Sequence, residues 1–175
     1  LNTMVLIPAV CDAVSIPVIA AGGIADGRGM AAAFALGAEG VQVGTRFLTA
    51  EECCVAQAYK DKVIAAKDSD TIVTGRAGGH PVRGLKNKLT REIRQMEAAG
   101  KGDSAEAEER LAGSLRRAVQ GDVDNGSMMA GQSACLVHDC KPAAEIVEEL
   151  VAQAQQWATF GLQEMADRNA VRAWK

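Results

Sequence analysis

Apolar positions near the start of the chain follow two different periods. Residues 4–14 are largely apolar at helical spacing, which predicts a helix. The short β-branched run at residues 16–21 ends in two glycines, and it predicts a strand buried on both faces. A helix rich in Ala, Met and Leu is expected over residues 29–36, and a second buried strand over residues 40–48. This order predicts a βαβ unit and therefore a parallel sheet.

The remaining pattern predicts shorter elements. Helical spacing covers residues 51–66, and a short strand is expected at residues 71–74, before a glycine-rich turn. Residues 111–119 and 141–157 are amphipathic, which predicts a short helix and a long structural helix. The chain is therefore expected to be an α/β protein. Two architectures remain open from the pattern, an open doubly wound sheet and a closed (β/α)8 barrel.

Composition narrows the class of partner. The chain has 175 residues, 48% of them hydrophobic, and a formal net charge of −3. A folded core is therefore expected, and neither nucleic acid nor an anionic membrane is the expected partner. The sequence has neither a transmembrane run nor a signal-peptide pattern, which favours a cytoplasmic location. Leu1 lies inside the first helical pattern and is not an initiating Met, so we expect a fragment of a longer protein.

Metal chemistry is not expected. The five cysteines form an odd set without CxxC spacing, and the two histidines, His80 and His138, are too few for a zinc site. Free thiols in a reducing compartment are the expected state of the cysteines. For His138 we expect a surface position without a chemical role.

Two glycine turns carry the candidate chemistry. Gly22 and Gly23 follow the first expected strand, and Gly44 and Thr45 end the second. Backbone N–H groups at such turns, together with a helix beginning near Asp26, are suited to binding a phosphate dianion. The alternative is that these glycines only close the strands. Because their spacing does not match GxGxxG, the dinucleotide-binding doubly wound fold is disfavoured.

Longer motifs extend this interpretation. Residues 16–27 and 40–47 resemble the FMN-binding half of the nitronate monooxygenase and 2-nitropropane dioxygenase-like superfamily. Residues 79–91 and 121–132 are similar to its branch of FMN-dependent enoyl-acyl-carrier-protein reductases of type II. The resemblance implies the C-terminal part of a (β/α)8 TIM barrel with an inserted small substrate domain. It weakens after about Trp157.

The same resemblance implies three segments. Residues 1–70 are expected to hold the C-terminal βα units of the barrel with the FMN phosphate site. Residues 71–132 are expected to form a substrate or lid subdomain. Residues 133–175 are expected to be C-terminal helices that pack on the barrel.

Site residues follow from matching the motifs position by position. The residues implied to bind FMN are Gly22, Gly23, Gln42, Val43, Gly44 and Thr45. The residues expected on the substrate side are His80, Arg83, Met128, Met129 and Gln132. The catalytic residues stay unknown, because the His-rich motif of the family is absent from this sequence and is expected upstream of Leu1.

Several of these residues have a second interpretation. His80 has either a structural or substrate-side role or takes part directly in the chemistry. The basic segment at residues 83–94 is either a solvated helix face or a docking surface for an acidic partner. Met128 and Met129 are either core filler or the lining of an acyl-chain pocket.

The resemblance implies an oxidoreductase of fatty-acid synthesis. In that family FMN takes a hydride from NADH or NADPH and passes it to the double bond of a trans-2-enoyl thioester on acyl carrier protein. One alternative is a nitronate monooxygenase, which oxidises small alkyl nitronates with flavin and oxygen. Another is an incomplete, non-catalytic fragment, since this chain alone is expected to be inactive. The oligomeric state stays open, with a homodimer as one option.

Overall fold

The chain folds into two compact units. The computed structural model describes residues 1–172, with side chains described through Gly161 and at Gln163. The first unit comprises Leu1–Val43 and the chain from Pro142 onward, and the second comprises Gly44–Lys141. The predicted segment boundaries at residues 70 and 132 both fall within the second unit. The functional division of the chain into three segments stays a prediction.

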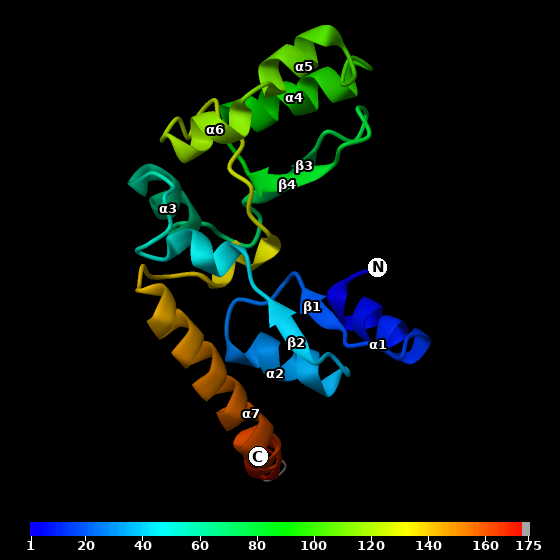
Figure 1. Cartoon of the computed structure of the whole chain (residues 1–175), viewed down its shortest axis with the longest axis vertical. Helices are drawn as coiled ribbons and strands as arrows, with labels where there is room; N and C mark the ends of the chain where they lie inside the picture. Colours follow the sequence, from blue (N-terminus) through cyan, green and yellow to red (C-terminus); the bar gives the residue numbers. More distant parts are fainter. Residues whose placement is uncertain (173–175) are drawn as a thin grey trace. The chain divides into compact units, whose positions relative to one another are not determined.

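The first unit contains the predicted βαβ unit (Figure 1). Its elements are α1 (Thr3–Ala13), β1 (Ile19–Ala21), α2 (Gly27–Ala35), β2 (Gly40–Gln42) and α7 (Ala143–Arg172). Strands β1 and β2 pair in parallel, with Ile19 opposite Gly40 and Ala21 opposite Gln42. The parallel pair is confirmed, and it brings the carboxyl ends of both strands side by side.

Burial on both faces of the first strand is wrong for the residues described. Only Ala20 of β1 is buried, while Ile19 is 57% exposed. The core of this unit lies on one side of the two strands, where Ala20 packs with Ile7, Ile24 and Ala33. A sheet with a single packed layer leaves the alternate side chains of its strands outside, because successive residues point to opposite faces.

Helices α2 and α7 pack closely through a glycine. A Cβ atom at Gly27 would lie 2.3 Å from Cβ of Gln153 and 2.4 Å from the backbone nitrogen of Ala154. The Gly27 amide also donates a hydrogen bond of 3.0 Å to Oε1 of Gln153. Helix α7 runs well past residue 157, where the predicted helix ends. Among residues 1–172, no helix has the length and apolar character needed to cross a membrane.

The second unit is built from short elements. They are η1 (Thr45–Thr49), α3 (Gln57–Ile64), β3 (Thr71–Thr74), β4 (Val82–Leu85), α4 (Lys88–Ala98), α5 (Ala105–Leu111), α6 (Ser114–Val119) and η2 (Gln132–Leu136), where η is a 3-10 helix. Strands β3 and β4 form an antiparallel hairpin, against which α4 packs (Figure 1). The strand at residues 71–74 is confirmed, and the short helix predicted at residues 111–119 is found at its C-terminal part.

Two predicted elements, one at the junction of the two units along the chain and one in the second unit, are wrong in part. The second strand ends at Gln42, and residues 45–49 form a 3-10 helix, because Gly44 leaves the extended conformation with φ −104° and ψ −67°. The basic segment is not one helix face either. Its first part is strand β4, and α4 begins only at Lys88, after Asn87. The Asn87 side chain accepts from the Thr90 amide at 2.9 Å, and the Asn87 amide donates to the Thr90 hydroxyl at 2.9 Å, so a capping box fixes the start of the helix.

We predict that Gly27→Ala destabilises the protein. The added methyl group would overlap α7, and the free energy of unfolding should fall by about 2 kcal/mol or more, as measured by urea unfolding followed by circular dichroism. Gly78→Ala is the matched control, since nothing lies within 4 Å of its Cβ position. Equal stability of the two variants would contradict the close approach of α2 and α7.

Candidate functional site

The first predicted phosphate turn follows β1 in the first unit. Gly22 and Gly23 have φ angles of 100° and 78°, in the left-handed region that favours glycine. Both line a pocket of about 270 Å³ with Thr3, whose hydroxyl donates to the Gly22 carbonyl at 3.1 Å. The amide of Gly23 donates to no acceptor among the described residues. This turn therefore offers an N–H group at the wall of a small pocket.

The N-terminus of α2 does not add to this turn, contrary to the prediction. Its amides are already bonded: Oδ1 of Asp26 accepts from Arg28 at 3.0 Å and from Gly29 at 3.3 Å. The Gly27 amide is bonded to Gln153. Partial burial alone would raise the pKa of Asp26, but the Arg28 side chain and the amides of Gly29 and Arg28 outweigh it and lower that pKa. A carboxylate thus occupies the place that a phosphate would need.

The second predicted turn follows β2. Gln42 and Val43 close the first unit, and Gly44 and Thr45 open the second. Nothing lies within 4 Å of a Cβ position at Gly44, so the backbone there is open to a ligand. The amides of Thr45 and Arg46 donate to no acceptor among the described residues. The turn therefore presents unused N–H donors beside open space, which is what an anion requires.

A buried arginine holds this turn in place. Arg46 is only 6% exposed. Its Nη1 donates to the Thr49 hydroxyl at 2.8 Å and to the Asp139 carbonyl at 3.2 Å, and its Nη2 donates to Oδ1 of Asp139 at 2.6 Å. Because the guanidinium is paired and hydrogen-bonded, its burial is tolerated. Arg46 directly follows Thr45 in the chain, and its guanidinium is paired with Asp139.

A pocket in the second unit joins this turn to the predicted substrate side. It measures about 370 Å³, and its lining residues are Gly44, Thr45, Leu48, Arg83, Met129, Ala130 and Gly131. The lining combines apolar side chains with one guanidinium, and Nη1 of Arg83 donates to the Thr71 hydroxyl at 2.9 Å. Gly44 and Thr45, two of the residues predicted to bind the cofactor, therefore share a pocket with Arg83 and Met129. These two residues were predicted on the substrate side.

Segment 128–131 forms one wall of this pocket, and its backbone is bonded on three sides. The Leu85 amide of β4 donates to the Met128 carbonyl at 2.9 Å, and the Ala130 amide donates to the Arg83 carbonyl at 3.3 Å. Near the other end, the Gly131 amide donates to the hydroxyl of Thr45 at 2.9 Å.

The third side of segment 128–131 is held by α3. The hydroxyl of Tyr59, a buried residue, donates to the Met129 carbonyl at 2.7 Å. Burial raises the pKa of Tyr59 far above its usual range, so the hydroxyl keeps its proton for this bond. The position of segment 128–131 is thus set by hydrogen bonds.

The other predicted substrate-side residues lie in different places. Met128 is 1% exposed and belongs to the core, whereas Met129 is 40% exposed and lines the pocket. Met128 is therefore core filler, whereas Met129 lines a pocket, and an acyl chain as the occupant of this pocket stays a prediction. His80 is exposed in the turn between β3 and β4, and Gln132 is exposed at the start of η2. Neither lines the pocket of about 370 Å³.

Sequence reasoning does not single out Leu48, Tyr59 or Arg46 as residues of this site. Two of them leave a signal in the sequence. Arg46 is a charged residue inside an apolar run, where burial requires a partner. Tyr59 is the single tyrosine of the chain, and a buried tyrosine usually directs its hydroxyl to an acceptor. Leu48 carries no such signal, since any buried element contains leucine.

Comparison with known proteins decides the family. The profile described as nitronate monooxygenase matches residues 1–153. The chain belongs to the nitronate monooxygenase family. This confirms the resemblance inferred from the motifs. Members of this family are flavin-dependent oxidoreductases, and FMN as the cofactor of this protein stays a prediction.

The relatives of this nitronate monooxygenase family member have different names. A probable nitronate monooxygenase of Staphylococcus aureus is 41% identical over 159 residues, which make up 89% of this chain and 43% of that protein. The structure of FabK from Thermotoga maritima matches with a TM-score of 0.86 and 47% identity, over 96% of this chain and 52% of FabK. A nitroalkane oxidase from Streptomyces ansochromogenes matches with a TM-score of 0.75 and 29% identity, over 93% of this chain and 46% of that protein.

The chain spans about half the length of these relatives. Its α/β elements are part of the TIM-barrel fold of the nitronate monooxygenase family and FabK, and the barrel is not closed within the part of the chain that the structure describes. The predicted fold class is therefore confirmed for the partial barrel.

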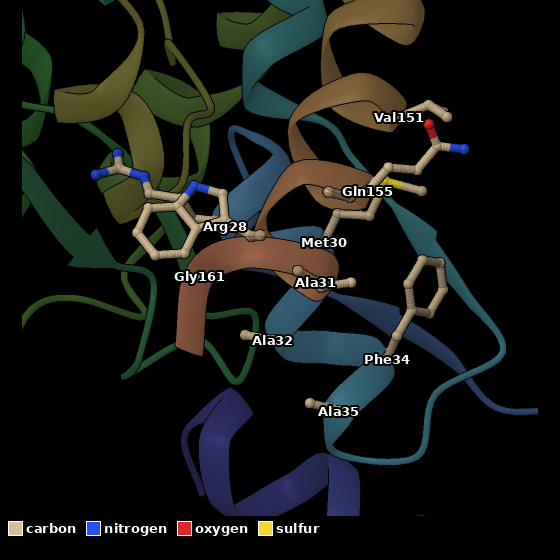
Figure 2. Close-up of a pocket in the computed structure, with 12 residues that line it drawn as sticks. Arg28, Met30, Ala31, Ala32, Phe34, Ala35, Val151, Gln155 and Gly161 are labelled. Atoms are coloured by element: carbon tan, nitrogen blue, oxygen red, sulfur yellow. The ribbon is translucent and has the colours of Figure 1, made fainter. Parts of the chain in front are cut away.

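A larger groove of this family member is not the candidate site. It measures about 710 Å³ and lies between α2 and α7, where Figure 2 shows Met30 and Phe34 of α2 on one side and Val151 of α7 on the other. Its charged lining residue, Arg28, is paired with Asp26 at 2.5 Å. Without converging polar groups, this groove lacks the features by which a chemical site is recognised.

We predict that Asp26→Ala lowers stability in a pH-dependent way. Loss of the helix cap should cost about 1 kcal/mol of unfolding free energy at pH 7. Because the folded-state pKa of Asp26 is lowered, its contribution is complete above the ordinary pKa of an unfolded aspartate and is lost as the pH falls through the folded-state pKa. Urea unfolding between neutral pH and about pH 3 measures the difference. Asp68→Ala, at an exposed position, is the control, and a pH-independent difference for Asp26→Ala would contradict the expectation.

Proposed function

We propose that the protein is an FMN-dependent oxidoreductase that reduces trans-2-enoyl thioesters on acyl carrier protein with NADH or NADPH, in fatty-acid synthesis. The observation that carries the proposal is the shared pocket, in which Thr45 of the phosphate turn is bonded to Gly131 of segment 128–131. Its support from relatives is the 47% identity with FabK, the name of an enoyl-acyl-carrier-protein reductase of type II.

The residues of the two turns fit a phosphate monoester such as FMN. Gly22 and Gly23 keep a left-handed backbone that brings their N–H groups to a pocket wall. Gly44 leaves open space, and the Thr45 hydroxyl has one proton that no described residue accepts. Neutral N–H and O–H donors of this kind are well suited to a dianion. FMN, when bound, supplies hydride transfer between a nicotinamide and the acceptor.

The chain's own residues bind and orient the two partners of this transfer. The turn residues would hold the phosphate of FMN through their N–H groups and the Thr45 hydroxyl. Leu48, Met129 and Ala130 form an apolar wall that excludes water and suits an acyl chain. The Arg83 guanidinium, oriented by the Thr71 hydroxyl, is placed to hold an oxygen of the acceptor or of the nicotinamide cofactor.

Oxidation of nitronates is the second candidate function. The curated relative with 41% identity is named a probable nitronate monooxygenase, and a nitroalkane oxidase shares the fold at 29% identity. The same phosphate turns serve both activities, because both use flavin. The apolar wall of the pocket suits an acyl chain, and the 47% identity with FabK supports the reductase over the oxidation of nitronates. If the whole protein proves colourless, the chain is an incomplete, non-catalytic fragment.

Two reactions of the whole protein separate these functions. We expect anaerobic NADH or NADPH oxidation to depend on a crotonyl thioester, and oxygen uptake with an alkyl nitronate to stay at background. Flavin released by heating should chromatograph as FMN. Nitronate-dependent oxygen uptake without thioester reduction would assign the second function and reject the first.

Variants test the pocket in the same assay. Arg83→Gln should raise KM for the thioester or the nicotinamide about tenfold while leaving the bound flavin unchanged, since the side chain lines the acceptor side. Arg116→Gln, at an exposed arginine of α6, is the matched control. Equal kinetics of the two variants would show that the pocket is not where the acceptor binds.

A basic surface on and before α4 is proposed to dock acyl carrier protein. The α4 basic face consists of Lys86, Lys88 and Arg91, which are exposed and form no ion pair with the described residues. By contrast, Arg94 is paired with Glu97 at 3.1 Å. Acyl carrier protein is acidic, so unpaired exposed cations would steer it by charge complementarity.

Charge reversal tests this surface. Lys88→Glu with Arg91→Glu should raise KM for crotonyl-acyl-carrier protein about tenfold at low salt and less at high salt, since exposed charges are screened. Kinetics with a crotonyl thioester of a small neutral thiol should not change. The control is Lys62→Glu with Lys67→Glu, two exposed lysines on and after α3. A loss with both thioesters would point to misfolding or to the active site, and would reject docking at α4.

A further inference from the structure

Thr45 stands at the junction between the phosphate turn and the wall of the acceptor pocket. It lines the pocket of about 370 Å³, and its Oγ1 accepts the Gly131 amide at 2.9 Å. A hydroxyl has one proton and two lone pairs. One lone pair is used by Gly131, and the proton is donated to no acceptor among the described residues. The side chain is therefore able to donate to an anion while it accepts from Gly131.

The Gly131 carbonyl accepts the Ala134 amide at 3.1 Å, a local bond at the start of η2, and its amide is bonded only to Thr45 among the described residues. The other long-range bonds of segment 128–131 run to β4, through Met128 and Ala130, and to α3, through the carbonyl of Met129. A Cβ atom at Gly131 would lie 3.3 Å from the Thr45 hydroxyl oxygen, so the segment and the turn are in direct contact. Among the described residues, Thr45 is thus the polar side chain through which the turn holds this segment.

We propose that Thr45 is a positioning residue that couples binding of a phosphate monoester at the turn to the order of segment 128–131, and through it to the shape of the acceptor pocket. The inference rests on the proposed function, in which the phosphate is that of FMN. When the Thr45 hydroxyl donates to a charged phosphate oxygen, its own oxygen becomes a better acceptor, because consecutive hydrogen bonds polarise one another. The bond from Gly131 is then strengthened, although the flavin does not need to touch Gly131.

The consequence for the pocket follows from the positions of the neighbouring side chains. Met129 and Ala130 line the pocket next to Gly131. With the phosphate bound, both ends of the segment are held and the side chain of Met129 faces a fixed cavity. Without it, the Gly131 end opens more readily. The protein would therefore present an ordered acceptor pocket only after the cofactor is in place.

Amide hydrogen exchange of the whole protein tests this coupling without relying on activity. The exchange of the Gly131 amide is measured by NMR in the apoprotein, with FMN, and with riboflavin, which has the same ring and no phosphate. FMN should slow this exchange about tenfold, and riboflavin should leave it unchanged. Equal protection by the two flavins would overturn the proposal, because the effect would then come from the ring.

Two variants at the same position separate the hydroxyl from the methyl group. Thr45→Val keeps the shape and removes the hydroxyl, so FMN should no longer slow exchange at Gly131. Thr45→Ser keeps the hydroxyl and should restore the effect of FMN. If Thr45→Val binds FMN and still shows the slowing, Thr45 has no coupling role. If the unaltered protein binds no FMN, as followed by flavin fluorescence, the proposed function fails, and the coupling fails with it.

Coupling between two sites is reciprocal, which gives a second readout. Gly131→Ala would press on the Thr45 hydroxyl, and we expect it to weaken FMN binding about fivefold while leaving riboflavin binding unchanged. Gly78→Ala is the control, since its Cβ position is open. Unchanged FMN affinity in Gly131→Ala would contradict the coupling even where Thr45→Val proves unstable.

Discussion

The hydrogen bond from the Gly131 amide to the Thr45 hydroxyl connects two parts of the chain that lie 86 residues apart. On one side of it is a turn with unused amides, and on the other is a wall of the pocket of about 370 Å³. A long-range bond of this kind is worth only about 1 kcal/mol, yet its geometry decides which residues share a cavity. The candidate chemistry of the second unit depends on this contact, because without it the turn and segment 128–131 are separate features.

Local sequence signals account for the elements that were predicted correctly. The βαβ unit follows from a change of hydrophobic period between two glycine turns, and both turns were found where the residue types place them. Strand β4 was missed because Arg83 and its basic neighbours suggested a charged helix face. Its extended conformation depends on pairing with β3 and on contact with Met129, which are long-range interactions. No local propensity encodes such pairing.

In the candidate site, too, local sequence signals predict some features, and long-range interactions determine the others. The two turns were predictable because glycine after a strand marks a chain reversal, and phosphate binding at these turns stays a prediction. The different fates of Met128 and Met129 were not, because the two residues are adjacent and of the same type. Only the hydrogen bonds of their backbone to β4 and α3 determine which one enters the core. The capping role of Asp26 was missed for another reason: an acid before a helix is equally consistent with a ligand site and with its own cap.

The bond from Tyr59 to the Met129 carbonyl has an evolutionary consequence. It holds the main chain at this position and leaves the side chain of residue 129 with little part in the core. An exchange at such a position changes the lining of the cavity at small cost to folding, because surface substitutions away from packed groups usually alter stability by only about 0.5 kcal/mol. The lining of this cavity can therefore change by single substitutions at residue 129, on an unaltered backbone.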